Sequence, residues 1–188
     1  MVMAGTISQG QGHDTVYKQI VAEQLGVPVD RIRVREGDTD MQGIGGGTGG
    51  SRSATCGGSA VYRAVLAAID KAKRLAAHQM EASVDDIEFA GGTFTIAGTD
   101  RSMTLDEVAK VSYTPGKQPD GVDAGIDERA TFSPKVANYP NGAHACEVEI
   151  DPDTGEIEIQ AYVIVDDVGT VLNPALLKGQ IHGGVAQG

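Results

Sequence analysis

The chain of 188 residues lacks tryptophan, and its aromatic residues amount to only 4%. A hydrophobic core must therefore be built mainly from Val, Ile, Leu and Ala. No stretch reaches the roughly 18 apolar residues of a membrane-spanning helix, and the first residues have neither the basic nor the apolar segment of a secretory signal. With 40% hydrophobic and 22% charged residues, the composition predicts a soluble, cytoplasmic, globular protein.

Basic residues are also scarce, because 15 Lys and Arg stand against 26 Asp and Glu and leave a net charge of −11. Such a charge repels phosphate backbones and anionic membrane surfaces. We therefore expect neither nucleic acid nor a membrane as a partner. An anion that binds to this chain must be held by groups in its immediate surroundings.

Several motifs of well-known chemistry are missing. The two cysteines, Cys56 and Cys146, form no CxxC pair, and neither has a His at the spacing of a zinc site. We expect both to be buried structural thiols in a reducing compartment. The chain contains no GxxxxGK[ST], HExxH or GxSxG sequence, which argues against P-loop hydrolysis, zincin chemistry and a nucleophile elbow.

Apolar residues at helical spacing predict an amphipathic helix over residues 14–25 and a long helix over residues 61–79. Thr104 and Glu107 have the spacing of a capping box and predict a short helix. Asn173, followed by proline, predicts the start of a further helix. The charged residues of the long helix that are expected to face mostly away from the core are Arg63, Asp70, Lys71 and Arg74.

Alternating apolar and polar residues predict the strands. They are expected at residues 31–37, in a hairpin over 87–97, at 130–132, and in a hairpin formed by 145–150 and 157–165. The segment 112–140 is rich in Pro, Gly, Asp and Asn and is expected to be a long ordered excursion. Hairpins with helices between them predict an α+β fold, a mostly antiparallel sheet with helices packed on one face.

Glycine-rich loops precede three of the expected helices, at residues 10–14, 47–54 and 167–174. Such loops leave backbone N–H groups free beside a helix start, where the helix dipole favours anions such as phosphates. Gln9, Gln11 and Gln180 can each offer a donor and an acceptor to a heterocycle. A single loop of this kind is more often a tight turn or a cap, so these residues alone leave both interpretations open.

A nucleotide-binding Rossmann fold is the weaker alternative. Gly45, Gly47 and Gly50 match GxGxxG, but they lie several residues beyond the expected strand. The acidic residue about twenty positions further on, Asp70, falls in the middle of a helix and does not end a second strand. This interpretation would require a parallel sheet with a strand that runs directly into Gly45.

The four histidines do not cluster in the sequence. His78 is expected on the helix surface and His144 in a structural role. His13 and His182 adjoin the loops and are candidates for ligand contact. Asp166, with the neighbouring Asp167, ends a strand, where both turns and binding sites occur.

Four motifs in order resemble a known family: GTISQGQGHDT (5–15), GDTD (37–40), GTGGSRSATCGGSAVY (47–62) and DDVGTVLNPALLKGQIHGGVAQG (166–188). They resemble the molybdenum-binding large subunit of the xanthine dehydrogenase and aldehyde oxidase family, in particular the carbon monoxide dehydrogenase large-chain type. The resemblance covers essentially the whole chain. It implies an oxidoreductase domain that binds molybdopterin with molybdenum, in its cytosine dinucleotide form in this branch, and hydroxylates substrates with oxygen drawn from water.

The resemblance also implies which residues bind the cofactor. Gln11 would lie beside the pterin and the molybdenum ligands, and Gln180 would contact the pterin. Asp167, Asn173 and Lys178 of the last motif would contact the dinucleotide. The cofactor-binding residues expected on this basis, with Gln9 added from the loop argument, are Gln9, Gly10, Gln11, Gly12, Thr48, Gly49, Gly50, Ser51, Ser53, Asp167, Asn173, Lys178 and Gln180.

The resemblance further implies that the chain is one part of an enzyme. We expect residues 1–188 to be part of a molybdopterin cofactor-binding domain, a fragment of a longer chain. The family's catalytic glutamate would lie beyond Gly188, so no catalytic residue and no protein ligand of the metal is expected here, and the isolated chain is expected to be inactive and without cofactor. Expected partners are the remainder of the large subunit, iron–sulfur and flavin subunits or domains, and a second copy in a homodimer. The alternative is a non-catalytic module for cofactor binding or interaction.

Overall fold

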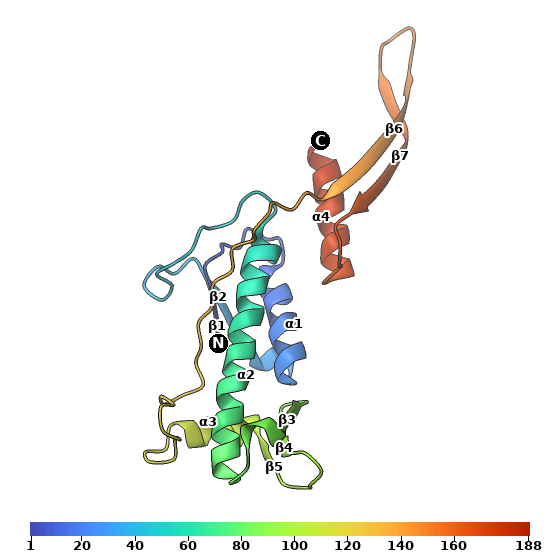
Figure 1. Ribbon diagram of the computed structural model, residues 1–188. Coiled ribbons are helices and arrows are strands. Elements are labelled where there is room, and N and C mark those ends of the chain that lie inside the picture. Colours follow the sequence, from blue (N-terminus) through green and yellow to red (C-terminus); the bar gives the residue numbers. More distant parts are fainter. The chain divides into compact units, whose positions relative to one another are not determined.

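A computed structural model describes all residues, 1–188, as two compact units, residues 1–134 and 135–188 (Figure 1). Each unit has its own helices and strands. They are described separately in the paragraphs that follow.

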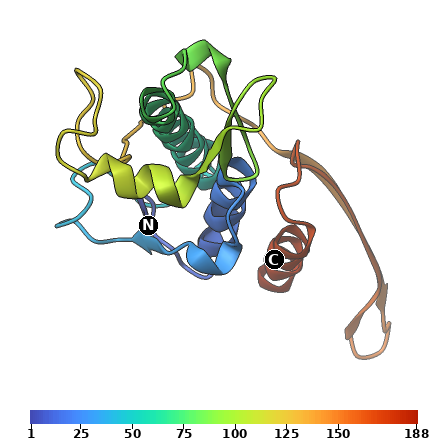
Figure 2. The same ribbon diagram turned by 90° about the horizontal axis from the view of Figure 1, so that it is seen from below.

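The first unit is built around two helices that lie side by side, α1 (His13–Leu25) and α2 (Ser59–Gln79) (Figures 1 and 2). Helix α1 connects two short parallel strands, β1 (Val2–Ala4) and β2 (Val34–Glu36), with a 3₁₀ turn at Val29–Arg31 before β2. Both helices and β2 were expected from the sequence. The parallel pairing was not, because strands of three residues carry too little alternation to reveal their partners.

A three-stranded antiparallel sheet packs at the other end of α2. Its strands are β3 (Ile87–Ala90), β4 (Thr93–Ile96) and β5 (Ser102–Thr104). The β3–β4 turn contains Gly91 and Gly92, both with left-handed backbone angles (φ 53° and 79°), as a two-residue hairpin loop requires. Helix α3 (Leu105–Ser112) follows β5 directly and begins with the expected capping box of Thr104 and Glu107.

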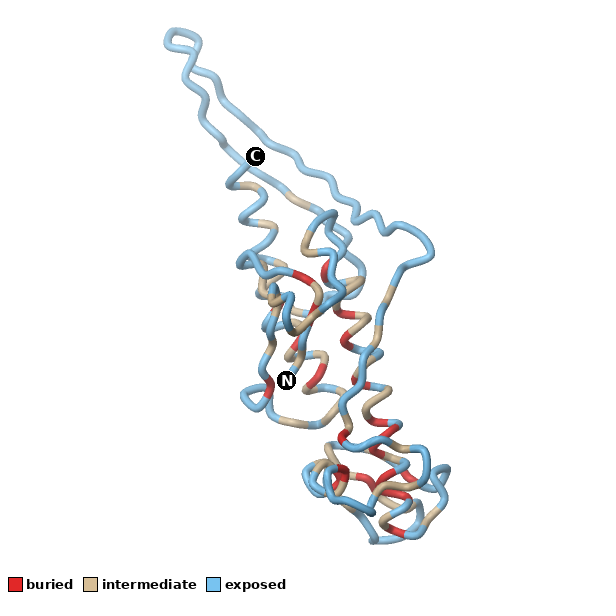
Figure 3. The backbone as a smooth tube through the Cα atoms, turned by 90° about the vertical axis from the view of Figure 1, so that its left-hand side faces the viewer, coloured by how far each residue is buried: buried red, intermediate tan, exposed pale blue.

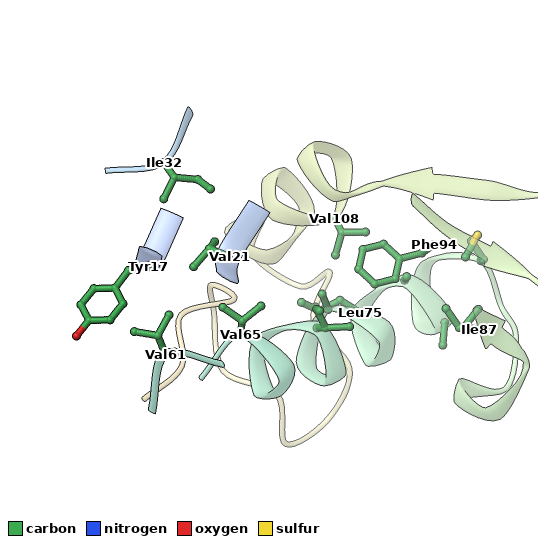
Figure 4. Close-up of a cluster of buried hydrophobic side chains, with 14 of the residues drawn as sticks. Tyr17, Val21, Ile32, Val61, Val65, Leu75, Ile87, Phe94 and Val108 are labelled. Atoms are coloured by element: carbon green, nitrogen blue, oxygen red, sulfur yellow. The ribbon is translucent and has the colours of Figure 1, made fainter. Parts of the chain in front are cut away.

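The core of this unit joins the sheet to the helices (Figures 3 and 4). Phe94 of β4 and Val108 of α3 are fully buried against Leu75 of α2, and Ile87 of β3 lies beside them. Closer to the start of α2, Tyr17 and Val21 of α1 pack against Val61 and Val65. Helices therefore cover one face of an antiparallel sheet, as the sequence predicted.

The buried face of α2 includes one charged residue, which corrects the expectation that Lys71 faces away. Lys71 is 8% exposed, and its Nζ lies 3.6 Å from Oε1 of Glu128. The aliphatic part of a lysine can cover apolar surface while its ammonium group reaches a partner. Helical spacing cannot reveal this pairing, because Glu128 belongs to a distant segment.

The segment between α3 and residue 134 has no strand, so the prediction of a strand at residues 130–132 is wrong. This part of the chain is held by α2. The Arg63 guanidinium lies 4.7 Å from the centre of the Phe132 ring and donates a hydrogen bond to the carbonyl oxygen of Thr131. This cation–π contact, and not the backbone hydrogen bonds of a strand, therefore holds the segment against α2.

The second unit is a long hairpin followed by a helix: β6 (Asn141–Ile150), β7 (Ile157–Asp167) and α4 (Pro174–Gln187). Asp151 organises the hairpin turn, since its side chain accepts hydrogen bonds from the backbone N–H groups of Asp153 and Thr154. These bonds lower the pKa of Asp151. Cys146 is exposed on β6 and Cys56 in the first unit is half-buried, so the expectation of two buried thiols is wrong.

The α+β class with mostly antiparallel strands is confirmed, and the strands form three separate sheets, of which only β1–β2 is parallel. A further helical segment, the π-helix at Ser53–Gly58, leads directly into α2. No helix is both long and apolar enough to cross a membrane.

The buried contact between α2 and the antiparallel sheet predicts a large effect of truncation. Leu75→Ala should lower the free energy of unfolding by about 2–5 kcal/mol, because it leaves a cavity between Phe94 and Val108. Leu66→Ala, on the same helix but 37% exposed, should cost about 1 kcal/mol or less. Urea denaturation of the two variants measures the difference, and equal losses would contradict the packing.

Candidate functional site

Two of the glycine loops lie directly against each other in the first unit. A side chain at Gly5 would meet the carbonyl oxygen of Ile44 at 2.5 Å, and one at Gly45 would meet that of Gly5 at 2.6 Å. The Gly47 N–H donates to the carbonyl oxygen of Gly5 at 3.2 Å. Only glycine permits this approach, and the contact places the loop of residues 5–12 beside the loop of residues 41–52.

Thr48 fastens the same two loops through its hydroxyl group. Its Oγ1 donates to the carbonyl oxygen of Ile7 at 2.7 Å and accepts from the Ile7 N–H at 3.2 Å. The hydroxyl of Ser53, which is buried at the start of the π-helix, lies 3.1 Å away. Thr48 and Ser53 were expected to bind a cofactor, and in this chain their hydroxyl groups connect the loops to each other.

A buried polar cluster lies beneath the loop of residues 5–12. The Thr6 hydroxyl donates to Oε1 of Glu36, which also lies 3.0 Å from Nδ1 of His13. Tyr17 extends the cluster, because its hydroxyl lies 2.9 Å from Oγ1 of Thr6 and donates to the carbonyl oxygen of Ser53 at 3.3 Å. The rings of His13 and Tyr17 stack with centroids 5.5 Å apart. Every one of these polar groups therefore has a partner within the chain.

The cluster also depends on a glycine of the π-helix. A side chain at Gly57 would lie 2.3 Å from the Tyr17 hydroxyl and 3.0 Å from Cγ2 of Thr6. Burial raises the pKa of Tyr17, the hydrogen bond to Thr6 lowers it, and the negative charge of Glu36 raises it further. Tyr17 is therefore a neutral hydrogen-bonding group at physiological pH.

The outer surface of the two loops is open. Side chains built at Gly10, Gly49 and Gly50 would meet nothing within 4 Å, and the backbone N–H groups of these residues make no hydrogen bond within the chain. Ser51 is exposed and has a left-handed backbone (φ 52°), a conformation that serine rarely adopts and that is typical of constrained functional loops. Unpaired N–H groups on an accessible surface are ready to accept an anion.

Charge and helix ends favour an anion at the same surface. Residues 5–12 and 41–53 contain one charged side chain, Arg52, in a chain whose net charge is −11. Gly12, which is left-handed (φ 86°), is the N-cap residue of α1, and no side chain caps the first N–H groups of this helix. The loops therefore form a neutral to positive surface at an uncapped helix start, which suits a phosphate.

Gln11 takes part in this surface but is folded onto its own loop. Its Oε1 accepts from the Gln9 N–H at 2.5 Å, and its Nε2 donates to the carbonyl oxygen of Ile7 at 3.3 Å. The side chain of Gln9 is exposed. A bound ligand would exchange these local hydrogen bonds of Gln11 for its own.

The last motif lies in the second unit and forms a separate group. Asp167 accepts from the Gly169 N–H at 2.9 Å, and Asn173 caps α4 by accepting from the Leu176 N–H at 3.0 Å. Lys178 and His182 line an open groove of about 720 Å³ between β7 and α4, together with mostly apolar side chains. Gln180 is exposed on the same helix.

The structure thus joins the two loops that carry the predicted residues Gln9–Gly12 and Thr48–Ser53, through contacts of Gly5 and Ile7 with the second loop. His13 does not face a ligand surface, because it is buried against Glu36 and Tyr17. His78 is exposed, as expected. No three His, Cys, Asp or Glu side chains lie close enough together to hold a metal ion.

Sequence reasoning missed Thr6, Tyr17 and Glu36. Tyr17 reads as an ordinary helix residue, and Glu36 as the polar end of a strand. The one usable signal was the position of Glu36, since a carboxylate at the last residue of a strand next to glycine loops is often directed into a site. Their connection required the parallel pairing of β1 and β2, which no local pattern showed.

The GxGxxG sequence formed by Gly45, Gly47 and Gly50 does not form the loop of a Rossmann fold. Strand β2 ends at Glu36, and residues 37–44 separate it from Gly45. Gly50 leads into a π-helix, and Asp70 is exposed in the middle of α2. The strand that would have to run directly into Gly45 is absent, so the Rossmann alternative is wrong.

The first unit thus presents two joined glycine loops, one of which ends at the uncapped start of α1. Comparison with known families gives the chain its class. The family of molybdopterin cofactor-binding domains matches residues 1–188, and the chain belongs to this family.

Individual relatives show which kinds of protein in this family the chain is similar to. The chain is 39% identical to the carbon monoxide dehydrogenase large chain of Hydrogenophaga pseudoflava over 98% of its own length and 23% of that protein. It is 37% identical to subunit gamma of the 6-hydroxypseudooxynicotine dehydrogenase complex of Paenarthrobacter nicotinovorans, over all of its own length and 24% of the relative. The chain therefore spans about a quarter of the length of these relatives.

A solved structure agrees with the sequence relatives. The crystal structure of Cu,Mo-CO dehydrogenase in its carbon monoxide-reduced state matches with a TM-score of 0.88 and 39% identity, over 97% of this chain and 23% of the solved one. The solved relative is a dehydrogenase that contains molybdenum, and the two sequence relatives are the large chain of a dehydrogenase and a subunit of a dehydrogenase complex. The resemblance stated from the four motifs is confirmed.

The raised pKa of Tyr17 predicts how stability depends on pH. An unfolded tyrosine ionises near pH 10, whereas the buried Tyr17 resists ionisation. The contribution of Tyr17 to the free energy of unfolding is therefore present below pH 10 and is lost as the pH rises further. Between about pH 9 and 11 the unfolding free energy should fall less steeply for Tyr17→Phe than for the unchanged chain.

Urea denaturation across this pH range measures the slope. Tyr62→Phe is the matched control, because Tyr62 lies on α2 in the same unit and is 42% exposed. It should keep the slope of the unchanged chain. Equal slopes for all three proteins would show that Tyr17 ionises alike in the folded and unfolded states.

Proposed function

We propose that this chain is the cofactor-binding segment of a molybdenum hydroxylase related to the carbon monoxide dehydrogenase, aldehyde oxidase and xanthine dehydrogenase group. Its loops would hold molybdopterin in the cytosine dinucleotide form. The observation that carries the proposal is the contact of the two glycine loops, which leaves the N–H groups of Gly10 in one loop and of Gly49 and Gly50 in the other open and without partners in the chain.

The residues present fit such a group. Phosphate oxygens need several N–H donors and little negative charge around them, and residues 5–12 and 41–53 contain no carboxylate. A pterin needs neighbouring donors and acceptors in one plane, and the amide groups of Gln9 and Gln11 provide both. Ser51 adds an exposed hydroxyl beside the glycines.

The bound cofactor would supply the molybdenum centre that transfers oxygen from water to the substrate. The roles of the chain itself are binding and orientation. Thr48 and the Gly5–Gly45 contact keep the two loops at a fixed separation, so the ligand does not have to order them on binding. Gln11 would turn its amide group from Ile7 to the pterin side of the cofactor.

The last motif would contribute the remaining contacts. Lys178 is exposed and carries the positive charge that a pyrophosphate favours, and Gln180 offers an amide group to the pterin. Asp167 and Asn173 already have backbone partners. We therefore propose that these two residues shape the β7–α4 loop and hold it in place for the cofactor.

The rest of the enzyme would come from outside these 188 residues. Because the chain spans about 23% of its relative, we propose that the remainder of the large subunit supplies the catalytic glutamate and the substrate-selecting loop. Iron–sulfur and flavin partners would accept the electrons. The carboxylate of Glu36 lies beneath the loops but is buried and bound to Thr6 and His13, and the proposed catalytic glutamate lies outside these residues. We therefore infer that the isolated chain has no turnover; measurable hydroxylation by it would contradict this inference.

Substitution of the open glycines tests the binding surface. Gly50→Ala in the full-length enzyme should lower the molybdenum content about tenfold or more, because a methyl group would occupy the space of the ligand and the N–H geometry would change. Gly98→Ala is the matched control. Gly98 is also left-handed (φ 74°), also has nothing within 4 Å, and lies in the β4–β5 turn.

Both alanine variants should lose a similar amount of stability, about 1 kcal/mol, since the backbone strain is the same. Metal analysis and thermal unfolding, measured on the same preparations, separate the two effects. Equal molybdenum content in Gly50→Ala and Gly98→Ala would argue against cofactor binding at these loops.

The form of the cofactor is tested by its release. Acid treatment of the purified full-length enzyme should yield molybdenum, fluorescent oxidised pterin and CMP in near-equal amounts. Pterin without CMP would leave the cofactor proposal in place but exclude the cytosine dinucleotide form. The same assay on the 188-residue chain should find none of the three, because the enclosing parts of the subunit are needed to retain the ligand.

A further inference from the structure

One carboxylate oxygen joins the two ends of the loop of residues 7–12, which is called the glutamine loop here after Gln9 and Gln11. Oε1 of Glu36 accepts from the hydroxyl of Thr6, at the start of the loop, and lies 3.0 Å from Nδ1 of His13, at its end. The side chains of Glu36 and His13 are only 8% and 7% exposed. The residues between these two anchors carry the predicted contacts Gln9–Gly12.

The loop between the anchors has little else to hold its shape. Gly10 and Gly12 are both left-handed (φ 94° and 86°), and glycine loses more conformational freedom on folding than any other residue. The bonds of Gln11 run within the loop and do not tie it to the rest of the protein. Apart from the Ile7–Thr48 bonds, the position of the loop is therefore set by its ends.

Glu36 is itself held firmly. It is the last residue of β2 and pairs with Ala4 of β1, the second residue before Thr6. Its carboxylate lies beside the first residue of α1, where the helix dipole favours negative charge. A buried carboxylate with a hydroxyl and an imidazole as partners is costly to disturb, because loss of one partner leaves buried polar groups unpaired.

We propose that Glu36 is the positioning residue of the glutamine loop: it holds Thr6 and His13 at a fixed separation and so places Gln11 for the cofactor. This role rests on the proposed function. Glu36 does not touch the ligand surface. It acts through the two residues that it binds.

The test compares variants of the full-length enzyme. Glu36→Ala should speed amide hydrogen exchange of residues 7–12 about tenfold, because both anchors are lost, and should lower the molybdenum content several-fold. Glu36→Gln should restore both quantities in large part, since its amide oxygen can accept from Thr6 and His13. Tyr17→Phe is the control, because it removes two hydrogen bonds of the same cluster and leaves the Glu36 bonds in place.

Each outcome decides the role of Glu36. Unchanged exchange of residues 7–12 in Glu36→Ala, or the same increase in Tyr17→Phe, would overturn it. If Gly50→Ala loses molybdenum while Glu36→Ala keeps it, the cofactor site stands and the positioning role fails. If both keep molybdenum, the proposed function fails, and exchange alone then decides whether Glu36 holds the loop.

If Glu36→Ala does not fold, Thr6→Val is used in its place. Thr6→Val removes the hydroxyl that binds Glu36 at nearly constant volume. It also removes the Thr6–Tyr17 bond, so its effect is read against that of Tyr17→Phe. Faster exchange in Thr6→Val than in Tyr17→Phe supports the role of Glu36, and equal exchange contradicts it.

Discussion

The close backbone contact between Gly5 and Gly45 is the constraint on which the first unit's binding surface depends. Each glycine occupies space that the other's side chain would need, at 2.5 and 2.6 Å from a carbonyl oxygen. The contact brings together loops that lie forty residues apart in the sequence. With Thr48 across the same junction, it joins two segments into one surface on which the N–H groups of Gly10, Gly49 and Gly50 have no partner in the chain.

Beneath this surface the polar cluster has the opposite property, since each of its side chains has a partner. Hydrogen bonds of the cluster link the loop after β1 to α1 and β2, and Tyr17 reaches the π-helix through Ser53. The residues concerned are Thr6, His13, Tyr17 and Glu36. Side chains that are fully hydrogen-bonded beneath the loop, and backbone N–H groups without partners on its outer surface, are the arrangement expected of a rigid binding loop. Rigidity here comes from hydrogen bonds, because glycine loops have few side chains to pack.

The second unit is stabilised by different interactions from those of the first. A hairpin of two strands with exposed Val148, Ile150, Ile157 and Ile159 cannot be stabilised by its own pairing alone. Its defined features are local: the Asp151 turn, the Asn173 cap and the β6–β7 register. Apolar side chains are therefore exposed over much of the hairpin, and a surface of this kind is typical of an interaction site.

The sequence by itself determined the helices, both hairpins, the capping box at Thr104 and the glycine loops, because each depends on residues close together in the chain. Its motifs also determined the family. Only the tertiary structure decided the parallel β1–β2 pair, the burial of Lys71 against Glu128, the coil at residues 130–132 and the joining of Thr6 and His13 by Glu36. Those features depend on partners far apart in sequence, for which local periodicity carries no information.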